Sequence, residues 1–356
     1  MNNKIQMDKI AAGDYRGPAV ITYFFEGTDT LSADQASIER RYQGIISSVI
    51  KSGQFRGERF EVCPLALPSQ RGLRRVFLVG LGKQEEFRSD YLLNASAIGT
   101  EATLALGIDQ VASTLLDASE KVLPLIDQAQ LITEGAVLGS YQFDSYVTDK
   151  KPRPIALGGF TLLARNLPPL PVRDGMNWGR TSASATNYAR TLGNHPANVA
   201  TPDYLAKEAI ELSRQGGGVR CKVMERSEVE KLGMGAFLSV NQASSQSRPL
   251  KLILLEYRGT SHRGPRRPLP RIGLIGKGIT FDTGGISLKQ PKDMHEMKFD
   301  MCGAAAVMGV FQALPSLRLP VEVVGLIPAT ENMPGESATR PGDIVKSMYG
   351  KTIEVI

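Results

Sequence analysis

GKGITFDTGGISLK, residues 276–289, and MKFDMCGAAA, residues 297–306, are the two stretches that decide the fold. The apolar segment 272–275 comes directly before them, so we expect a buried strand that ends in a glycine-rich loop. In open α/β sheets, ligands bind at the carboxyl ends of strands. The sequence therefore predicts an α/β sheet with a ligand site at this loop.

Two aspartates in these stretches, Asp282 and Asp300, are candidate ligands for a cation, because carboxylate oxygens suit Zn²⁺ and Mn²⁺. The glycines allow positive φ angles and a close approach of the backbone, and the small residues 303–306 would open a helix packed beneath the site. Three plainer interpretations stay open. Residues 276–278 resemble a phosphate loop, although a Walker A motif needs a longer spacing and a Ser or Thr after its lysine. Asp282 is also typical of a simple turn, and Asp300 of a helix N-cap.

Outward from these stretches, strands and helices alternate in both halves of the chain, which predicts α/β layers in each. We expect strands at 19–25, 75–79, 110–115, 160–164, 218–224, 251–257, 271–275, 321–328 and 352–356. We expect helices at 33–51, 89–106, 123–146, 174–192 and 304–313, and another that Thr201 caps. The proline-rich segment 166–172 indicates a boundary, with an α/β domain at 1–165, a linker at 166–178 and a second domain at 179–356.

The composition limits the class of protein. With 356 residues, 42% of them hydrophobic, the chain is long enough for two domains. We see neither an apolar run of about 18 residues nor a signal peptide, so we expect a cytoplasmic protein with no membrane partner. Three cysteines without a CxxC pair and three histidines without an HExxH motif leave carboxylates as metal ligands. The basic segment 258–271 lacks interleaved aromatic residues, which favours a solvated loop over a nucleic-acid surface.

The two stretches resemble the metal-binding core of the leucyl (cytosol) aminopeptidase family, with that family's spacing. The resemblance extends to EGAVLGSYQFDSY at 134–146, NHPANVATPDYL at 194–205, GMGAFLS at 233–239 and ENMPGESATRPGD at 331–343. It implies a macrodomain-like N-terminal α/β domain and a catalytic α/β domain with a mixed central sheet between helices. It also implies a homohexameric peptidase that uses two metal ions, Mn²⁺ or Zn²⁺, to remove N-terminal residues, often leucine, from peptides with a free N-terminus.

The same resemblance assigns roles to five residues. Lys277, Asp282 and Asp300 match the ligands of the more tightly bound metal, and Asp282 also matches the bridging ligand. A lysine ligand has to be neutral, so the dication and desolvation must lower its pKa. Lys289 matches the cationic lysine that binds substrate and stabilises the oxyanion, and Met297 lines the pocket for the first side chain. An ordinary salt-bridging role for both lysines is the alternative.

Other interpretations compete with a metallopeptidase. Cys302 and His295 are the residue types of a cysteine nucleophile and its base, although the family does not use this cysteine so. The turn at 80–82 is a candidate nucleotide-binding loop in the first domain. A non-catalytic scaffold or a DNA-binding paralogue is consistent with the net charge of +6.

The chain departs from the family at its last residue, Ile356. The family continues there into Asn-Thr-Asp-Ala-Glu-Gly-Arg, which supplies an aspartate ligand, the bridging glutamate and the arginine of the bicarbonate site. We therefore expect an incomplete catalytic domain without the bicarbonate site, weak metal binding and little or no peptidase activity. We expect a fragment of an active parent rather than a long-degenerate paralogue.

Overall fold

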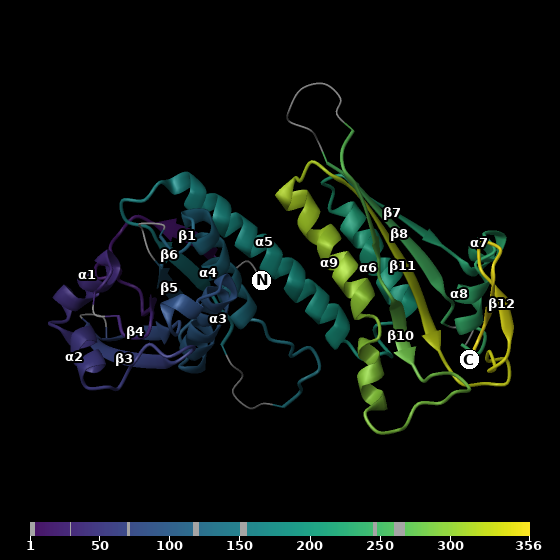
Figure 1. Ribbon diagram of the computed structural model, residues 1–356, viewed down its shortest axis with the longest axis horizontal. Coiled ribbons are helices and arrows are strands. Elements are labelled where there is room, and N and C mark those ends of the chain that lie inside the picture. The colour runs from purple at the N-terminus through teal and green to yellow at the C-terminus, as the bar shows by residue number, and fades with distance from the viewer. Residues whose placement is uncertain are drawn as a thin grey trace. The chain divides into compact units, whose positions relative to one another are not determined.

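The computed structural model describes residues 4–28, 30–69, 72–116, 121–149, 155–244, 248–259 and 268–356 (Figure 1). The chain forms two compact units, Met1–Ser184 (unit 1) and Ala185–Ile356 (unit 2). The division falls inside the long helix α5 (Pro169–Asn194), so residues 169–178 of the expected linker are helical. Prolines are tolerated in the first turn of a helix, where the N–H groups have no partner within the helix. For this reason α5 begins before residue 174, where we expected it to begin.

Unit 1 is built on a six-stranded sheet in the order β1-β6-β5-β2-β4-β3. All neighbours are parallel except β3 and β4. Helices α3 and α4 pack on one face and α1 and α2 on the other, so every residue of β2 is buried. The bounds are β1 (Lys4–Asp8), β2 (Ala19–Phe24), α1 (Ala33–Arg41), α2 (Ile45–Lys51), β3 (Val62–Ser69), β4 (Gly72–Gly80), η1 (Gln84–Glu86), α3 (Ser89–Ala105), β5 (Gln110–Thr114), α4 (Leu125–Gly139) and β6 (Gly159–Leu163).

Unit 1 differs from the sequence prediction in three places. Strands β1 and β3 were not expected; β3 contains Pro64 and Pro68, which hide its pattern and are tolerated because it is an edge strand. The helix expected at 33–51 is two helices, because Gln43 and Gly44 have φ angles of 50° and 87° between them. The helix expected to reach 146 ends at Gly139.

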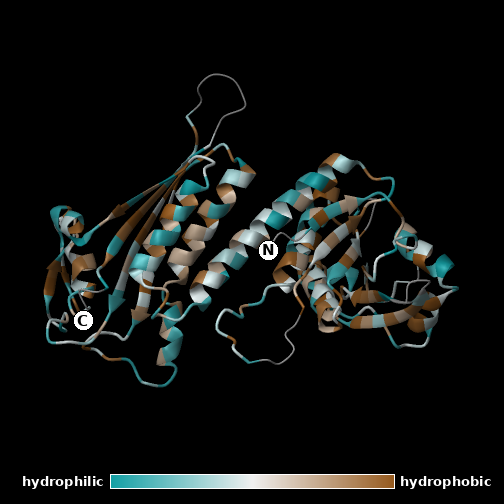
Figure 2. Ribbon diagram, turned by 180° about the vertical axis from the view of Figure 1, so that it is seen from behind, coloured by the Kyte–Doolittle hydropathy of each residue, from teal (hydrophilic) through white to brown (hydrophobic). Residues whose placement is uncertain are grey.

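Unit 2 is built on a mixed sheet in the order β10-β11-β8-β7, with β9 also paired to β11. β8 is antiparallel to β7 and β11, whereas β9 and β10 run parallel to β11. Helices α6 and α9 pack on one face, and α7 and α8 pack on part of the other. Figure 2 shows hydrophobic residues concentrated along the strands of this sheet. The bounds are α6 (Pro202–Arg214), β7 (Val219–Met224), α7 (Arg226–Lys231), α8 (Gly235–Val240), β8 (Lys251–Arg258), β9 (Arg271–Ile275), β10 (Gly278–Asp282), η2 (Met294–Phe299), α9 (Cys302–Leu317) and β11 (Glu322–Asn332).

The prediction of two α/β domains, the second with a mixed sheet between helices, is confirmed. The expected cap is present, because the backbone N–H of Tyr204 donates to Thr201 Oγ1 at 3.2 Å. The strand expected at 352–356 is shorter. It forms β13 (Thr352–Glu354), which pairs with β12 (Ile344–Lys346) in a separate two-stranded sheet.

One helical stretch of the described chain, Met294–Leu317, is long and apolar enough to cross a membrane by length and composition. The sequence prediction had found no such stretch. Its α9 portion buries Ala304, Met308 and Phe311 in the core of unit 2, together with Met301 at the N-cap. A core helix of an α/β sheet meets the same criterion, and that is how α9 packs. The absence of a membrane partner stays a prediction.

Candidate functional site

The five predicted site residues lie in one region of unit 2, around the carboxyl ends of β10 and β11. Asp282 is the last residue of β10, and parallel pairing places it beside Asn332, the last residue of β11. Lys277 occupies the break between β9 and β10. Asp300 follows η2 and stands just before α9.

Two glycines allow the break between β9 and β10 to pack on the first turn of α9. A Cβ atom on Gly276 would lie 2.5 Å from the Gly303 carbonyl oxygen, and one on Gly303 would lie 2.9 Å from the Lys277 backbone nitrogen. The N–H of Ala304 donates to the Lys277 carbonyl at 2.9 Å. This is the close packing that we expected from the small residues 303–306. It holds the Lys277 backbone where its side chain reaches Asp300.

The side chains form two ion pairs. Lys277 Nζ lies 2.9 Å from Asp300 Oδ1, and Lys289 Nζ lies 2.5 Å from Asp282 Oδ2. Lys289 Nζ also lies 3.2 Å from the Met297 sulfur. The structure thus brings each predicted lysine to a predicted aspartate, and Met297 to the second pair.

The two carboxyl groups have opposite pKa shifts. Burial raises the pKa of Asp300, and the neighbouring Asp282 adds to this effect. Burial acts in the same direction on Asp282. There, hydrogen bonds from Lys289, the Gly284 N–H and Asn332 prevail and lower the pKa. Asp282 is therefore held as an anion, and Asp300 beside it favours a bound proton or cation.

Asp300 Oδ2 is the atom at which either a proton or a cation would be bound. Within the described part of the chain, this buried oxygen has no hydrogen-bond donor, and a buried carboxylate oxygen without one is destabilising. Two carboxylates are donors of the kind that Zn²⁺ and Mn²⁺ accept, and the amine of Lys277, which pairs with Asp300 in this structure, becomes a nitrogen donor once it is deprotonated. The described residues contain no group of three or more His, Cys, Asp and Glu suited to a metal. This donor set therefore consists of two carboxylates and one lysine.

The plainer interpretations are partly correct. Asp282 does stand at a turn: Gly284 and Gly285 have φ angles of 87° and 71°, and the Gly284 N–H donates to Asp282 Oδ1 at 2.9 Å. Asp300 does not cap α9, because Met301 stands at the N-cap position. The turn and the ion pair with Lys289 use the same carboxylate, so the turn fixes Oδ1 of Asp282 and Oδ2 faces a cation.

The cysteine interpretation gains no support. Partial burial raises the pKa of the Cys302 thiol, and the charge of Asp300 raises it further. A nucleophilic cysteine needs the opposite shift, because the thiolate is the reactive form. All three cysteines, Cys63, Cys221 and Cys302, are free.

The turn at 80–82 in unit 1 is closed by backbone hydrogen bonds. The N–H groups of Gly80, Leu81 and Gly82 donate to the carbonyls of Glu61, Phe24 and Gly57, at 2.8–2.9 Å. A phosphate group would need such N–H groups as donors. The amides that the nucleotide hypothesis requires are therefore already used.

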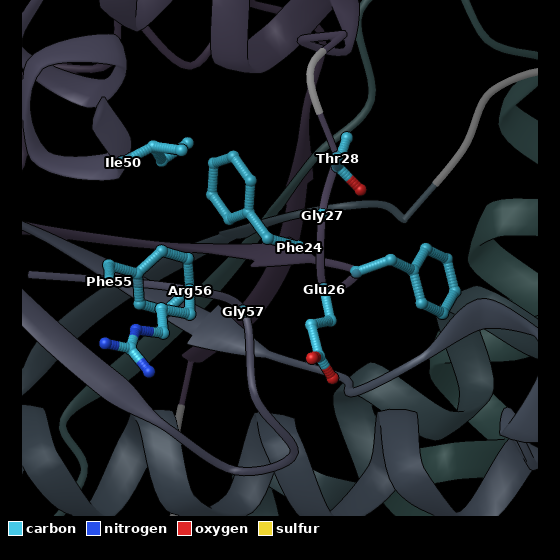
Figure 3. A pocket seen from close by; sticks show the side chains of 9 residues that line it. Phe24, Glu26, Gly27, Thr28, Ile50, Phe55, Arg56 and Gly57 are labelled. Atoms are coloured by element: carbon cyan, nitrogen blue, oxygen red, sulfur yellow. The ribbon is translucent and has the colours of Figure 1, made fainter. Parts of the chain in front are cut away.

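A small pocket of about 230 Å³ lies near this turn (Figure 3). This volume is below the roughly 300–1,000 Å³ of typical ligand pockets. Phe24 and Phe55 pack edge to face at 5.5 Å, and the charged ends of Glu26 and Arg56 are directed apart. The Arg56 side chain is 70% exposed and pairs with Glu58 at 3.8 Å. The pocket therefore lacks converging polar groups among its described lining residues.

Part of the basic segment 258–271 falls outside the described residues, namely 260–267. At its two ends, Arg258 and Arg271 both pair with Glu322, at 3.2 and 2.9 Å. These two exposed arginines share one carboxylate, so Glu322 offsets only half of their charge, and the low expectation of nucleic-acid binding stays a prediction.

Sequence reasoning missed Asn332. Its side chain donates to Asp282 Oδ1 at 2.8 Å. It lies in the segment 331–343, which supports the family resemblance but in which the resemblance assigned no site residue. The parallel pairing of β10 and β11, which places these two strand ends side by side, could not be read from the sequence.

Fold and site together define a class: a two-domain α/β protein with aspartate and lysine side chains gathered where β10 and β11 of its mixed sheet end, as a candidate cation site. Residues 187–356 match the catalytic domain of the cytosol aminopeptidase family, and residues 20–150 match the N-terminal domain of the same family. The chain belongs to the cytosol aminopeptidase family, and the resemblance stated from the sequence is confirmed.

Individual relatives agree. A probable cytosol aminopeptidase of Nitrosococcus oceani is 38% identical over 96% of this chain and 67% of its own length. The cytosol aminopeptidase of Pseudomonas aeruginosa is 40% identical over 92% of this chain and 64% of its own. The chain thus spans about two thirds of these relatives.

Two solved structures share the fold. A mutant of tomato leucine aminopeptidase is 26% identical, with a TM-score of 0.83 over 99% of this chain and 68% of its own. The bottromycin maturation enzyme BotP in complex with Mn is 31% identical, with a TM-score of 0.75 over 95% of this chain and 65% of its own.

Proposed function

We propose that the protein is a metallo-aminopeptidase that hydrolyses the N-terminal residue, often leucine, from peptides with a free N-terminus. The observation that carries the proposal is the meeting of Lys277–Asp300 and Lys289–Asp282 at one edge of the sheet, around a buried Asp300 oxygen that no described donor reaches. Membership of the family supports the peptidase class. The Mn complex of BotP supports manganese as one candidate metal.

Each residue has a role in this proposal. Lys277, Asp282 and Asp300 would hold the more tightly bound of two ions, Mn²⁺ or Zn²⁺, with Asp282 shared between them. Ions bound there would supply an acidified water as nucleophile and a Lewis acid for the substrate carbonyl. Lys289, held in place by Asp282 Oδ2, stabilises the negative charge that develops on the substrate's carbonyl oxygen. Met297, in contact with Lys289, lines the pocket for the first side chain.

The wider setting is proposed on the same basis. The relatives are named cytosol aminopeptidases, which supports a cytoplasmic location. A homohexamer and the low activity expected of these 356 residues alone stay predictions. The alternative, a non-catalytic scaffold or DNA-binding paralogue, requires no metal at Asp282 and Asp300, so metal binding separates the two.

The decisive measurement is Mn²⁺ content per chain, by elemental analysis after equilibration and gel filtration. We expect Asp282→Asn and Asp300→Asn to retain less Mn²⁺ than the wild type, because each loses a carboxylate ligand. The control is Asp343→Asn, since Asp343 pairs with Arg340 in the same unit. Equal Mn²⁺ in all four proteins would contradict the proposal.

Activity is tested with Leu-p-nitroanilide. Lys289→Gln is expected to keep the metal content of the wild type and to lower kcat by about 100-fold or more, because it removes the cation that stabilises the oxyanion. If the wild type hydrolyses the substrate at a measurable rate and Lys289→Gln is equally fast, the assigned role of Lys289 is wrong. A wild-type rate typical of the family would contradict the expected low activity.

A further inference from the structure

Asn332 is the residue at this site whose contacts have no role in the mechanism above. It ends β11 directly beside Asp282, its parallel neighbour in the sheet. Its side-chain nitrogen, Nδ2, donates to Asp282 Oδ1 at 2.8 Å. The contact therefore joins the ends of the two strands through the carboxylate that matches the bridging ligand.

The two oxygens of Asp282 are used differently. Oδ1 accepts hydrogen bonds from Asn332 and from the Gly284 N–H, at 2.8 and 2.9 Å. Oδ2 accepts a hydrogen bond from the amine of Lys289, a side-chain cation, at 2.5 Å. With Oδ1 held by two neutral donors, the carboxylate plane is fixed and Oδ2 is the oxygen that faces positive charge.

Asn332 is itself held in place. Its carbonyl oxygen accepts from both the N–H and the hydroxyl of Thr283, at 2.9 and 2.8 Å. The preceding residue, Glu331, is 3% exposed and pairs with Arg248 at 2.5 Å. On its other side, a Cβ atom on Gly285 would lie 3.0 Å from Asn332 Oδ1. The Thr283 contacts at the strand end, the Gly285 turn and the Glu331–Arg248 ion pair surround Asn332. Its carboxamide therefore has little freedom to rotate.

We propose that Asn332 is a positioning residue: its carboxamide orients the Asp282 carboxylate so that Oδ2 is presented to the metal. The inference rests on the proposed function, because it assigns Asp282 as a ligand. The residue type fits the task. An amide supplies the N–H donor without a charge, whereas an aspartate would add a second anion beside Asp282, and a serine is too short to reach it. Partners that orient a ligand typically contribute 10- to 100-fold to metal affinity.

The test compares two asparagines of the same unit in the 356-residue protein. Asn332→Ala removes the bond to Asp282. Asn241→Ala removes a buried side-chain hydrogen bond to Thr330, two residues earlier on β11, and leaves Asp282 untouched. The Mn²⁺ dissociation constant is measured from the electron paramagnetic resonance signal of free Mn²⁺. The visible spectrum of bound Co²⁺ reports the ligand geometry, and thermal unfolding reports stability.

Asn332→Ala is expected to raise the Mn²⁺ dissociation constant by about 10-fold or more and to change the Co²⁺ spectrum. Asn241→Ala is expected to lower the unfolding temperature and leave both metal readouts as in the wild type. If Asn332→Ala does not fold, Asn332→Ser is expected to give the same loss of affinity. An Asn332 variant with wild-type affinity and spectrum would overturn the proposal, and so would an equal loss in both asparagine variants.

Failure of the proposed function is distinguishable from failure of this inference. If Asp282→Asn binds Mn²⁺ as the wild type does, Asp282 is not a ligand. In that case both the proposed metal site and the proposed role of Asn332 are wrong. If Asp282→Asn loses Mn²⁺ and Asn332→Ala does not, the metal site stands and only the positioning role is wrong.

Discussion

The carboxyl end of β4 in unit 1 and the carboxyl ends of β10 and β11 in unit 2 occupy equivalent places in two α/β sheets, yet they are built in opposite ways. The turn at 80–82 gives its three N–H groups to backbone carbonyls. The loop after β10 brings together aspartate and lysine side chains, with one buried oxygen left without a described donor. Strand ends provide the position for a site, and the side chains there decide whether it is used.

The two ends should also differ in what they contribute to stability. A closed turn with every amide bonded and no room for extra atoms adds to the stability of its unit. Two adjacent carboxylates, one with an unsatisfied oxygen, reduce it in the absence of a cation. Substitutions should therefore be costly at the first end and cheap or stabilising at the second.

Gly80→Ala should have the largest effect. A Cβ atom on Gly80 would lie 1.9 Å from the Glu58 carbonyl oxygen and 2.6 Å from the Gly57 carbonyl carbon, both of them backbone atoms. Because the backbone has to shift, we expect a loss of more than about 3 kcal/mol in the free energy of unfolding. Urea denaturation followed by the fluorescence of Trp178, the single tryptophan, reports on unit 1.

Gly27→Ala is the control for this substitution. Gly27 also lies at a turn of unit 1, and no atom lies within 4 Å of the position its Cβ would take. Its φ of 69° still makes alanine unfavourable, by about 1–2 kcal/mol. Similar losses for the two variants would show that the turn at 80–82 is not tightly closed.

Much of the fold could be predicted because its signals are local. Apolar β-prone runs gave β2, β8 and β9, and the Thr201-Pro202 pair gave the start of α6. The expectation that β9 is buried was wrong: it pairs only with β11 among the described strands, and most of its residues are exposed, with Ile275 at 79%. The errors came where tertiary context prevails over local pattern. The prolines of β3 obscured its strand pattern, although an edge strand tolerates them. The prolines at the start of α5 suggested a linker, although the first turn of a helix tolerates them too.

The candidate site likewise has a part that could be predicted from the sequence and a part that could not. Lys277, Asp282, Lys289 and Asp300 could be named from their spacing and the resemblance, because they fall within two neighbouring stretches. Which lysine pairs with which aspartate depends on tertiary packing, such as that of Gly276 on Gly303, which the sequence does not reveal. Asn332 is 50 residues from Asp282, and only the sheet register brings them together.

Arg74 extends the comparison, because it is a buried cation of unit 1 whose contacts support the fold, whereas the lysines of unit 2 lie at the candidate site. It is 3% exposed, lies between the rings of Tyr15 and Tyr42, and donates to the carbonyl oxygens of Ala12 and Gly13. Arg74→Met leaves both carbonyls without this donor, so we expect a loss of about 2–3 kcal/mol in the free energy of unfolding. Trp178 fluorescence in urea measures it.

The neighbouring Arg75 supplies the control, since it lies on the same strand and is only partly buried. Arg75→Met should change the free energy of unfolding by less than about 0.5 kcal/mol. If the two variants are equally stable, the buried guanidinium does not stabilise unit 1, and the contrast with the lysines of unit 2 is lost.

Asp300→Asn should have the smallest effect, and the opposite sign. It removes the charge that repels Asp282 and supplies a side-chain N–H, at the cost of the ion pair with Lys277, whose side chain is 57% exposed. A half-exposed pair contributes little, and solvent also screens the repulsion that is relieved, so we expect a net gain of about 0.5 kcal/mol in metal-free protein. Thermal unfolding followed by circular dichroism, in the presence of a chelator, measures this gain. Asp343→Asn, which loses only a surface pair with Arg340, should be slightly destabilised under the same conditions. A clear loss of stability in Asp300→Asn would mean that Asp300 serves the fold, and that the strand end of unit 2 is as structural as that of unit 1.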